Sequence, residues 1–334
     1  MTMKQNLRSF LKAILPFVKK PLTQFLSLCN PHFFQEKLSV VVYHDVSDTP
    51  SEFSKKYSLN VEPDIFDKQI AFFKKQFNII SPEDLLNGNE LPQKPMLITF
   101  DDGFLNVFKN ALPILSYHNV PVLLFLNYGP VKGEMFWAGL ITFLCDNDKD
   151  FCVYLEQNNQ KMKENVPDLL KCSQKIVFNY LKSKNLEMDS IIEQYVGSFV
   201  TETILREQEK NQLVYLGNHL YNHYVSALMS DDEFITEYLH NEQELEKYCN
   251  HINMFSFPFG QPGSCFSEHQ IELLKLQGVR KIFTSSGALN IDSKENVLDR
   301  IGLINEDSSP NKILFRLYER KIRELPIVRY FAMG

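Results

Sequence analysis

The residues best suited to chemistry are two adjacent carboxylates and a pair of histidines. Asp101 and Asp102 follow an apolar run that ends at Phe100, while His219 and His223 stand four residues apart. Two histidines and one carboxylate suit a catalytic divalent metal, with a position left for water. The second carboxylate can then act as general base. Each motif also has a plainer explanation, because Asp-Gly is a common turn and histidines often serve in packed cores.

The placement of these residues after apolar runs favours the chemical interpretation. His44, the two aspartates, His219 and the Pro258-Phe259 pair each follow a run that predicts a strand. In a parallel barrel or sheet the carboxyl ends of the strands open on one face, where catalytic residues gather. We therefore expect these groups to converge. The strands are expected at 38–43, 96–100, 120–126, 212–216, 253–257, 279–284 and 297–303.

Helical patterns alternate with these strands, which favours a parallel α/β fold. Helices are expected at 64–77, 104–117 (with a kink at Pro113), 231–249 and 267–276. Between 133 and 211 the alternation stops, and the sequence is polar and helical without strand signals. We expect an inserted helical subdomain there, which either caps a cleft or decorates the surface.

Length, net charge and cysteine content limit the number of domains, the kind of partner and the compartment. The chain has 334 residues, enough for one large α/β domain or two smaller ones, and its net charge of -6 gives no reason to expect a nucleic-acid partner. The six cysteines show no CxxC pair and no framework spacing, which is more typical of a reducing compartment. No apolar run reaches the ~18 residues that a spanning helix needs.

Both ends of the chain are basic. Residues 1–29 contain five cations, no acid and apolar residues at helical spacing, so a basic amphipathic helix is expected within 1–35. Lys12 interrupts the apolar stretch and a lysine pair follows it, which disfavours a secretory signal. Such a helix either lies in a membrane surface or packs on the domain. A second basic helix is expected at 307–334. The expected location is cytoplasmic, and peripheral on the inner face of the membrane if the N-terminal helix lies in a membrane surface.

Three motifs carry a family resemblance. The segments 99–103 (TFDDG), 219–223 (HLYNH) and 257–260 (FPFG) resemble the first three motifs of the polysaccharide deacetylases, the NodB-like family-4 carbohydrate esterases. Enzymes of that family remove acetyl groups from N-acetylated sugars, depend on a metal and have a distorted (β/α)7 barrel. The resemblance extends over 38–128 and 213–303, which implies a barrel built from 36–132 and 212–306 around the insert at 133–211.

The resemblance implies a role for each motif residue. Asp101 corresponds to the general base. Asp102, His219 and His223 correspond to the metal ligands, and zinc is the expected ion. The backbone N–H of Phe259 corresponds to an oxyanion donor, a role that does not depend on the side chain.

The sequence departs from the family pattern at several positions. Leu220 stands where Ser or Thr is usual, Ser256 stands where an arginine often orients the base, and no Leu-x-His motif supplies the acid. The segment 43–46 (YHDV), however, resembles the permuted branch that includes the poly-N-acetylglucosamine deacetylases. In that branch the acid histidine comes from the first strand, a position that His44 fits, and Arg300 is the candidate to replace the orienting arginine.

These observations predict a metal-dependent hydrolase that removes an acetyl group from an N-acetylated sugar of a poly- or oligosaccharide. The partner is an acetylated amino-sugar glycan, which is lipid-linked if the N-terminal helix lies on a membrane. Two alternatives stay open. One is an O-acetyl esterase with the same site, and the other is a non-catalytic carbohydrate-binding relative.

Overall fold

A computed structural model describes residues 33–324, apart from position 89 and the stretches 159–161, 164–165, 168–173 and 185–189. The helix expected within residues 1–35 therefore lies almost wholly outside the described residues, as does the end of the basic segment expected at 307–334. Both expectations stay predictions there.

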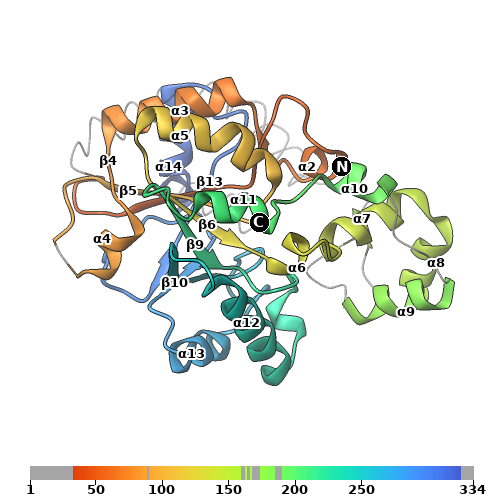
Figure 1. Cartoon of the computed structure of the whole chain (residues 1–334). Helices are drawn as coiled ribbons and strands as arrows, with labels where there is room; N and C mark the ends of the chain where they lie inside the picture. The colour runs from red at the N-terminus through yellow and green to blue at the C-terminus, as the bar shows by residue number, and fades with distance from the viewer. Residues whose placement is uncertain are drawn as a thin grey trace, which may run out of the picture.

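Parallel strands form a barrel (Figure 1). Eight strands follow one another around it in the order β12-β11-β10-β9-β6-β5-β1-β13, and only Arg300 separates β12 from β13 in the chain. Because β12 pairs with β11 and β13 pairs with β1, this one segment closes the barrel. The eight strands thus occupy seven barrel positions, and the expected distorted (β/α)7 barrel is confirmed. The strands are β1 (Ser39–Tyr43), β5 (Pro95–Phe100), β6 (Val122–Leu126), β9 (Val214–Asn218), β10 (His251–Ser256), β11 (Lys281–Thr284), β12 (Val297–Asp299) and β13 (Ile301–Gly302).

The central strands are buried along their whole length. Every residue of β1, β5 and β6 is buried, which explains why these segments read as continuous apolar runs rather than as alternating patterns. Tyr43 is in register with Phe100, so the residues that follow β1 and β5 emerge side by side. A short strand, β4 (Asn78–Ile79), pairs with β5 outside this path, and β2 (Asp45–Val46) pairs with β3 (Asn60–Val61) just after β1.

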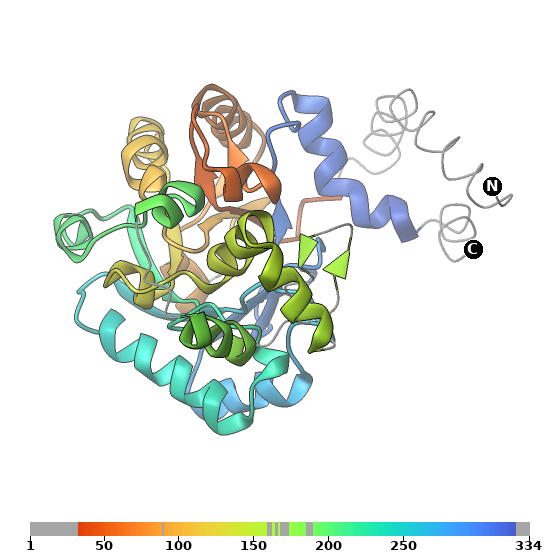
Figure 2. The ribbon, with the colours of Figure 1, turned by 90° about the vertical axis from the view of Figure 1, so that its right-hand side faces the viewer.

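Helices surround the barrel (Figure 2). Serines at positions 81, 230 and 267 begin three of them with capping boxes, in which the serine and the third helical residue satisfy each other's backbone N–H groups. The helices are α2 (Glu52–Lys56), α3 (Pro63–Gln76), α4 (Pro82–Leu86), α5 (Leu112–His118), α11 (Glu202–Gln208), η2 (Ser226–Leu228), α12 (Asp231–Leu245), α13 (Glu268–Leu276) and α14 (Pro310–Glu324).

The expected kink at Pro113 takes the form of a change in helix type. A π-helical turn, η1 (Val107–Ala111), leads into α5, and Pro113 lies in the first turn of α5. Proline has no backbone N–H for a bond to the preceding turn, so a helix start is a position that tolerates it.

The insert lies in front of the barrel in Figure 2, on the side where the strands end. Helix α6 (Tyr128–Val131) precedes the insert, which contains α7 (Trp137–Asn147), α8 (Lys149–Gln157), α9 (Gln174–Lys184) and α10 (Ser190–Val196). The expectation of a stretch without strands is wrong at one place, because β7 (Met162–Lys163) and β8 (Val166–Pro167) form an antiparallel pair. The chain returns to the barrel where Val200 N donates to Gly103 O, at 2.9 Å. The insert thus caps the mouth of the barrel rather than decorating a remote surface.

Helix α11 falls within the range expected for the insert but packs on the barrel. Arg206 of α11 donates to the carbonyl of Lys247 at 2.7 Å, and its guanidinium lies 4.2 Å from the ring centre of Tyr248. The part of the chain that leaves the barrel therefore ends before α11.

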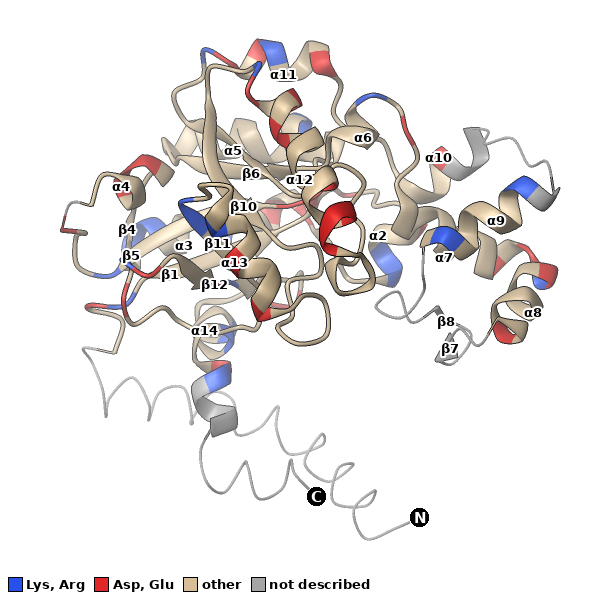
Figure 3. Cartoon of the chain, turned by 90° about the horizontal axis from the view of Figure 1, so that it is seen from below, with Lys and Arg blue, Asp and Glu red and all other residues tan. Residues whose placement is uncertain are grey.

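Helix α14 packs against the barrel through Ile313, Leu317 and Tyr318, which are buried. Two of its cations are paired with carboxylates outside the helix: Arg316 with Asp307 at 3.0 Å, and Arg320 with Asp299 at 3.4 Å. Figure 3 shows basic residues of α14 in blue. Within the described parts of the chain, no helix combines the length and the apolarity needed to cross a bilayer.

Candidate active site

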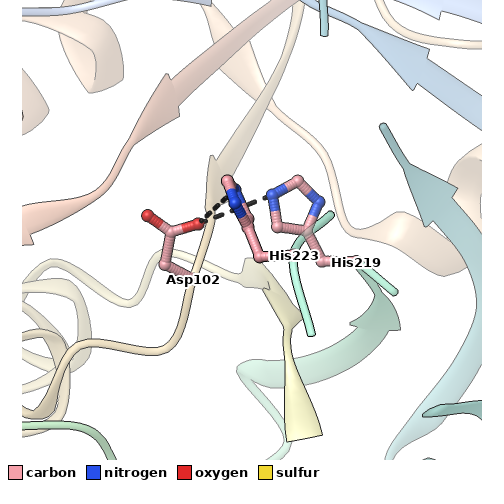
Figure 4. Close-up of side chains that lie close together, drawn as sticks. All are labelled: Asp102, His219 and His223. Carbon is pink, nitrogen blue, oxygen red and sulfur yellow. Dashed lines mark ion pairs between the residues drawn. The ribbon is translucent and has the colours of Figure 1, made fainter. Parts of the chain in front are cut away.

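Asp102, His219 and His223 form a buried cluster at the mouth of the barrel (Figure 4). One potential ligand atom from each residue lies within 4.8 Å of the others. The Nε2 atoms of His219 and His223 are 3.5 and 3.2 Å from the same carboxylate oxygen, Oδ1 of Asp102. Three groups from two strand ends thus point to one place.

The segment between the two histidines is a turn. Leu220 and His223 have positive φ angles of 61° and 58°, so no helical turn aligns the two rings. Asp102 has a φ of 71° at the end of β5. Left-handed conformations are unfavourable for such residues and persist where the surroundings impose them, which is common at functional sites.

Three buried asparagines impose this turn. The side-chain amide of Asn127 donates to the carbonyls of His219 and Leu220, the latter at 2.9 Å. The Asn218 carboxamide oxygen accepts from Leu220 N at 2.9 Å. Asn241 of α12 donates to that oxygen and to Leu126 O, both at 2.8 Å, and thereby links the ends of β6 and β9.

The cluster fits a divalent cation. Nδ1 of His219 donates to the carbonyl of Ser256 at 2.8 Å, which leaves Nε2 as the lone-pair nitrogen that faces Asp102. Oδ1 of Asp102 is buried and makes no hydrogen bond to any described residue. A buried carboxylate oxygen without a donor is rare, and here two imidazole nitrogens surround it, so a bound cation accounts for all three atoms.

Electrostatics keep these residues in forms that can bind a metal. Burial raises the pKa of Asp102, but the adjacent histidines, His223 first, hold it well below the ordinary value. Burial also lowers the pKa of His223, and Asp102 offsets only part of this. The pair is therefore a carboxylate next to a neutral imidazole at neutral pH.

Asp101 is held by Arg300. The guanidinium donates from Nη1 to Oδ1 at 2.6 Å and from Nη2 to Oδ2 at 2.7 Å, and both side chains are buried. Burial raises the pKa of Asp101, whereas Arg300 and then His219 lower it, so the pKa is below its ordinary value. Asp101 is thus a fixed carboxylate whose Oδ2 lies 3.8 Å from Nε2 of His219.

Ser256 occupies the position where an arginine often orients the base, and here the guanidinium of Arg300 contacts it instead. Nη2 of Arg300 donates to the Ser256 hydroxyl at 2.6 Å and to the Ser285 hydroxyl at 3.0 Å. The neighbouring Gly260 is required for this packing, since a Cβ there would lie 2.7 Å from the Ser285 side chain and its φ is +65°.

His44 and Phe259 border the cluster. His44 directly follows β1, where Asp101 N donates to Tyr43 O at 3.0 Å, and its half-buried ring makes no hydrogen bond to another described residue. Phe259 has a φ of 62°, and its ring centre lies 4.8 Å from that of His223. Within the described parts of the chain, its backbone N–H donates to no other group.

The structure therefore brings together every residue that the sequence singled out, and it adds others. The sequence interpretation missed the three asparagines. Asn127 and Asn218 each lie at the end of a predicted strand, the same signal that selected His44 and Asp101. It also missed Phe136 of the insert, whose ring centre lies 5.1 Å from that of His223.

The comparisons with known proteins agree with this geometry. The model of the family described as polysaccharide deacetylase matches residues 88–282. No curated protein shows significant sequence similarity to the chain.

Several solved structures have a similar fold at low sequence identity. The Streptococcus pyogenes deacetylase PplD, in complex with acetate, is 17% identical with a TM-score of 0.55 over 85% of this chain and 99% of that one. IcaB from Ammonifex degensii is 17% identical with a TM-score of 0.55, over 84% and 97%. A de-N-acetylase from Aggregatibacter actinomycetemcomitans is 17% identical with a TM-score of 0.56, over 84% and 100%. At this identity the likeness shows the fold alone.

Proposed function

The chain belongs to the polysaccharide deacetylase family, and from this premise we propose that it is a metal-dependent enzyme that hydrolyses the acetamide of an N-acetylated sugar. Membership makes it a hydrolase of carbon–nitrogen bonds that deacetylates an acetylated polysaccharide. The observation that carries the proposal is the buried Asp102–His219–His223 cluster beside the fixed carboxylate of Asp101.

The protein groups have distinct tasks in this proposal. Asp101, ionised and oriented by Arg300, takes a proton from water as the water adds to the acetyl carbonyl carbon. The backbone N–H of Phe259 donates to the developing oxyanion. His44 then protonates the sugar nitrogen, the C–N bond breaks, and acetate and the free amine leave.

Asp102, His219 and His223 would hold the divalent ion, and their carboxylate and imidazole donors make zinc the ion that we expect. A bound ion supplies Lewis acidity towards the acetyl carbonyl and lowers the pKa of water. Because the carboxylate and both rings are buried, the protein excludes bulk water from the same place.

A poly-N-acetylglucosamine-like glycan is the substrate class that we propose. Two features support it: His44 at the end of the first strand fits the permuted branch of the family, and the fold is similar to those of IcaB and of a de-N-acetylase. An O-acetyl ester is the competing substrate, because the same site would hydrolyse it with an alcohol as leaving group. A non-catalytic carbohydrate-binding role is disfavoured, since the base, the three ligand residues and the orienting arginine are all in place.

The test combines metal analysis with acetate release. Purified protein should contain about one equivalent of a divalent metal and should release acetate from N-acetylglucosamine oligomers faster than from O-acetylated sugars. The Asp102→Ala variant should lose both properties. Acetate release only from O-acetylated sugars would select the esterase, and no release from any substrate by the metal-loaded protein would leave the binding role.

We also propose that the chain works at a membrane surface, on a lipid-linked saccharide. The five cations and no acid within residues 1–29 support this, because each cation near an anionic leaflet contributes ~1 kcal/mol. Arg316 and Arg320 of α14 are already paired with the barrel and add little to such a surface. In flotation with anionic and neutral liposomes, the full chain should float with the anionic liposomes, whereas a chain that starts at Gln35 should not. Equal partitioning of the two chains rejects the membrane role.

A further inference from the structure

A continuous series of aromatic rings leads away from the metal-ligand cluster. The ring centre of Phe259 lies 4.8 Å from that of His223 and 6.4 Å from that of Trp137. The ring centre of Tyr224 lies 6.2 Å from that of Trp137 and 6.5 Å from that of Phe178 in α9. The series begins at a ligand residue on the barrel and ends on the insert.

Exposure changes along the series. His223 and Trp137 are buried, Phe259 and Tyr224 are half-buried, and Phe178 is 46% exposed. A single exposed phenylalanine is ordinary on a protein surface and needs no ligand to explain it. Phe178 differs from such a residue because its ring contacts that of the half-buried Tyr224, which directly follows His223 in the chain.

We propose that Tyr224 and Phe178 form a stacking subsite for a sugar ring of the glycan, next to the acetylated sugar at the metal-ligand cluster. The proposal rests on the proposed function and deepens it, because it makes a glycan of two or more sugars the substrate. One face of a pyranose ring presents C–H groups, which pack favourably on the electron-rich face of an aromatic ring. Aromatic side chains also provide this area at a small cost in conformational entropy.

Polar groups beside Tyr224 suit the hydroxyls of such a sugar. Two carboxylates, Glu237 and Glu134, are hydrogen-bonded to Asn222 and Tyr221, two and three residues before Tyr224 in the chain. Glu237 is fixed by Asn222, whose backbone N–H and side-chain amide donate to it at 2.9 and 2.8 Å. The hydroxyl of Tyr221 fixes Glu134 at 2.8 Å. Fixed carboxylates accept hydrogen bonds from hydroxyls, and a few such groups beside an apolar surface are typical of small-ligand sites.

The test compares a long and a short substrate. Full-length, metal-loaded enzyme is assayed with the N-acetylglucosamine monomer and with its β-1,4- and β-1,6-linked tetramers. Phe178→Ala should raise KM for the tetramer that the wild type uses by about tenfold and leave kcat nearly unchanged, since a stacked ring contributes roughly that much. The KM for the monomer should change much less.

Matched variants separate stacking from structure. Phe178→Trp should restore the tetramer KM, whereas Phe178→Leu, which keeps an apolar side chain but no ring, should resemble Phe178→Ala. Val153→Ala, at a 51% exposed position of α8 in the same insert, should behave as wild type. Melting temperatures check that each variant is folded.

The outcomes distinguish this subsite from the catalytic proposal. An unchanged tetramer KM in Phe178→Ala, or equal effects of Phe178→Ala and Val153→Ala, overturns the subsite while acetate release by the wild type still supports the deacetylase. Absence of acetate release by the wild type from all three substrates overturns the proposed function and the subsite with it.

Discussion

Arg300 donates both arms of its guanidinium to the carboxylate of Asp101, and it does so from the single residue that separates β12 from β13. The segment that closes the barrel thus also carries the partner of Asp101, the proposed general base. Nε of Arg300 donates to Thr284 O of β11 at 3.3 Å, and the guanidinium lies 5.3 Å from the ring centre of Phe125 of β6, so residues of both strands fix its direction. Closure of the barrel and orientation of the base depend on the same few residues.

Replacement of this arginine should change the pH dependence of activity. Burial raises the pKa of Asp101, and Arg300 is the largest influence that lowers it. A base accepts a proton only when it is ionised, so activity falls as pH drops through this pKa. In Arg300→Gln the pKa rises, and the acid limb of the kcat/KM profile should move to higher pH, with the largest loss of activity at low pH.

The control for this prediction is Arg280→Gln. Arg280 is exposed and donates to Leu86 O at 2.6 Å, away from Asp101, so its loss should leave the acid limb in place. Because Arg300→Gln leaves a buried carboxylate unpaired, a loss of roughly 3–5 kcal/mol in stability is also expected, and activity is normalised to folded protein. An acid limb identical to that of the wild type would show that Arg300 does not set the pKa of the base.

The two adjacent aspartates should separate into base and ligand. Asp101→Asn removes the proton acceptor but leaves the cluster of Asp102, His219 and His223 intact, so turnover should fall by ~10²–10⁴ while metal content is retained. Asp102→Asn replaces a carboxylate ligand by a neutral amide and should lose metal and activity together. The measurement is metal content and kcat on the same preparations. If Asp101→Asn lost its metal and Asp102→Asn kept it, the roles of base and ligand would have to be exchanged between the two aspartates.

The apolar runs were sufficient to predict parallel strands, because these strands are buried on both faces, and the family resemblance supplied the barrel. The sequence also placed His44, Asp101 and His219 together, since the ends of parallel strands meet on one face. The way in which His219 and His223 are aligned could not be predicted from the sequence. A spacing of four residues brings both rings to one face only in a helical turn, whereas the observed turn depends on left-handed residues held by asparagines that are distant in sequence.

The contact between Arg300 and Asp101 was only partly predictable from the sequence. The missing arginine at Ser256 indicated that another residue must orient the base, but the geometry depends on where the barrel closes. The strand expected over 297–303 is divided at Arg300, with one half paired to β11 and the other to β1. Such a division follows from the closure of the whole sheet and leaves no local signal.

His44 should supply the proton to the departing amine. His44→Ala should lower turnover on an N-acetylated sugar by ~10²–10⁴ with metal content unchanged. The activity of His44→Ala on an aryl acetate should fall much less, because that leaving group is a weak base and needs no proton. His269→Ala is the control, because His269 is exposed on α13 and pairs with Asp231 at 2.9 Å. Equal losses on both substrates would assign His44 to another step, and activity near that of the wild type would place the acid elsewhere.

The buried asparagine network should control metal affinity. Asn127 donates to the carbonyls of His219 and Leu220, and it thereby holds the turn that aims both imidazoles at Asp102. Asn127→Ala removes these bonds and leaves the carbonyls without that donor, a cost of roughly 1–3 kcal/mol in stability. Because the ligand residues themselves are intact, the expected result is a metal dissociation constant about 10–100-fold higher, with kcat near that of the wild type once metal is saturating.

Chelator competition measures this dissociation constant, and Asn250→Ala provides a matched control. Asn250 also donates its side-chain amide to β9, but to the carbonyl of Val214, at 3.0 Å, at the end of the strand remote from the histidines. Both variants lose a side-chain hydrogen bond at or just beyond an end of β9, and only Asn127→Ala should weaken metal binding. If the two variants hold metal equally well, the turn keeps its shape without Asn127, and the left-handed residues at 220 and 223 are stabilised by the ligand cluster itself.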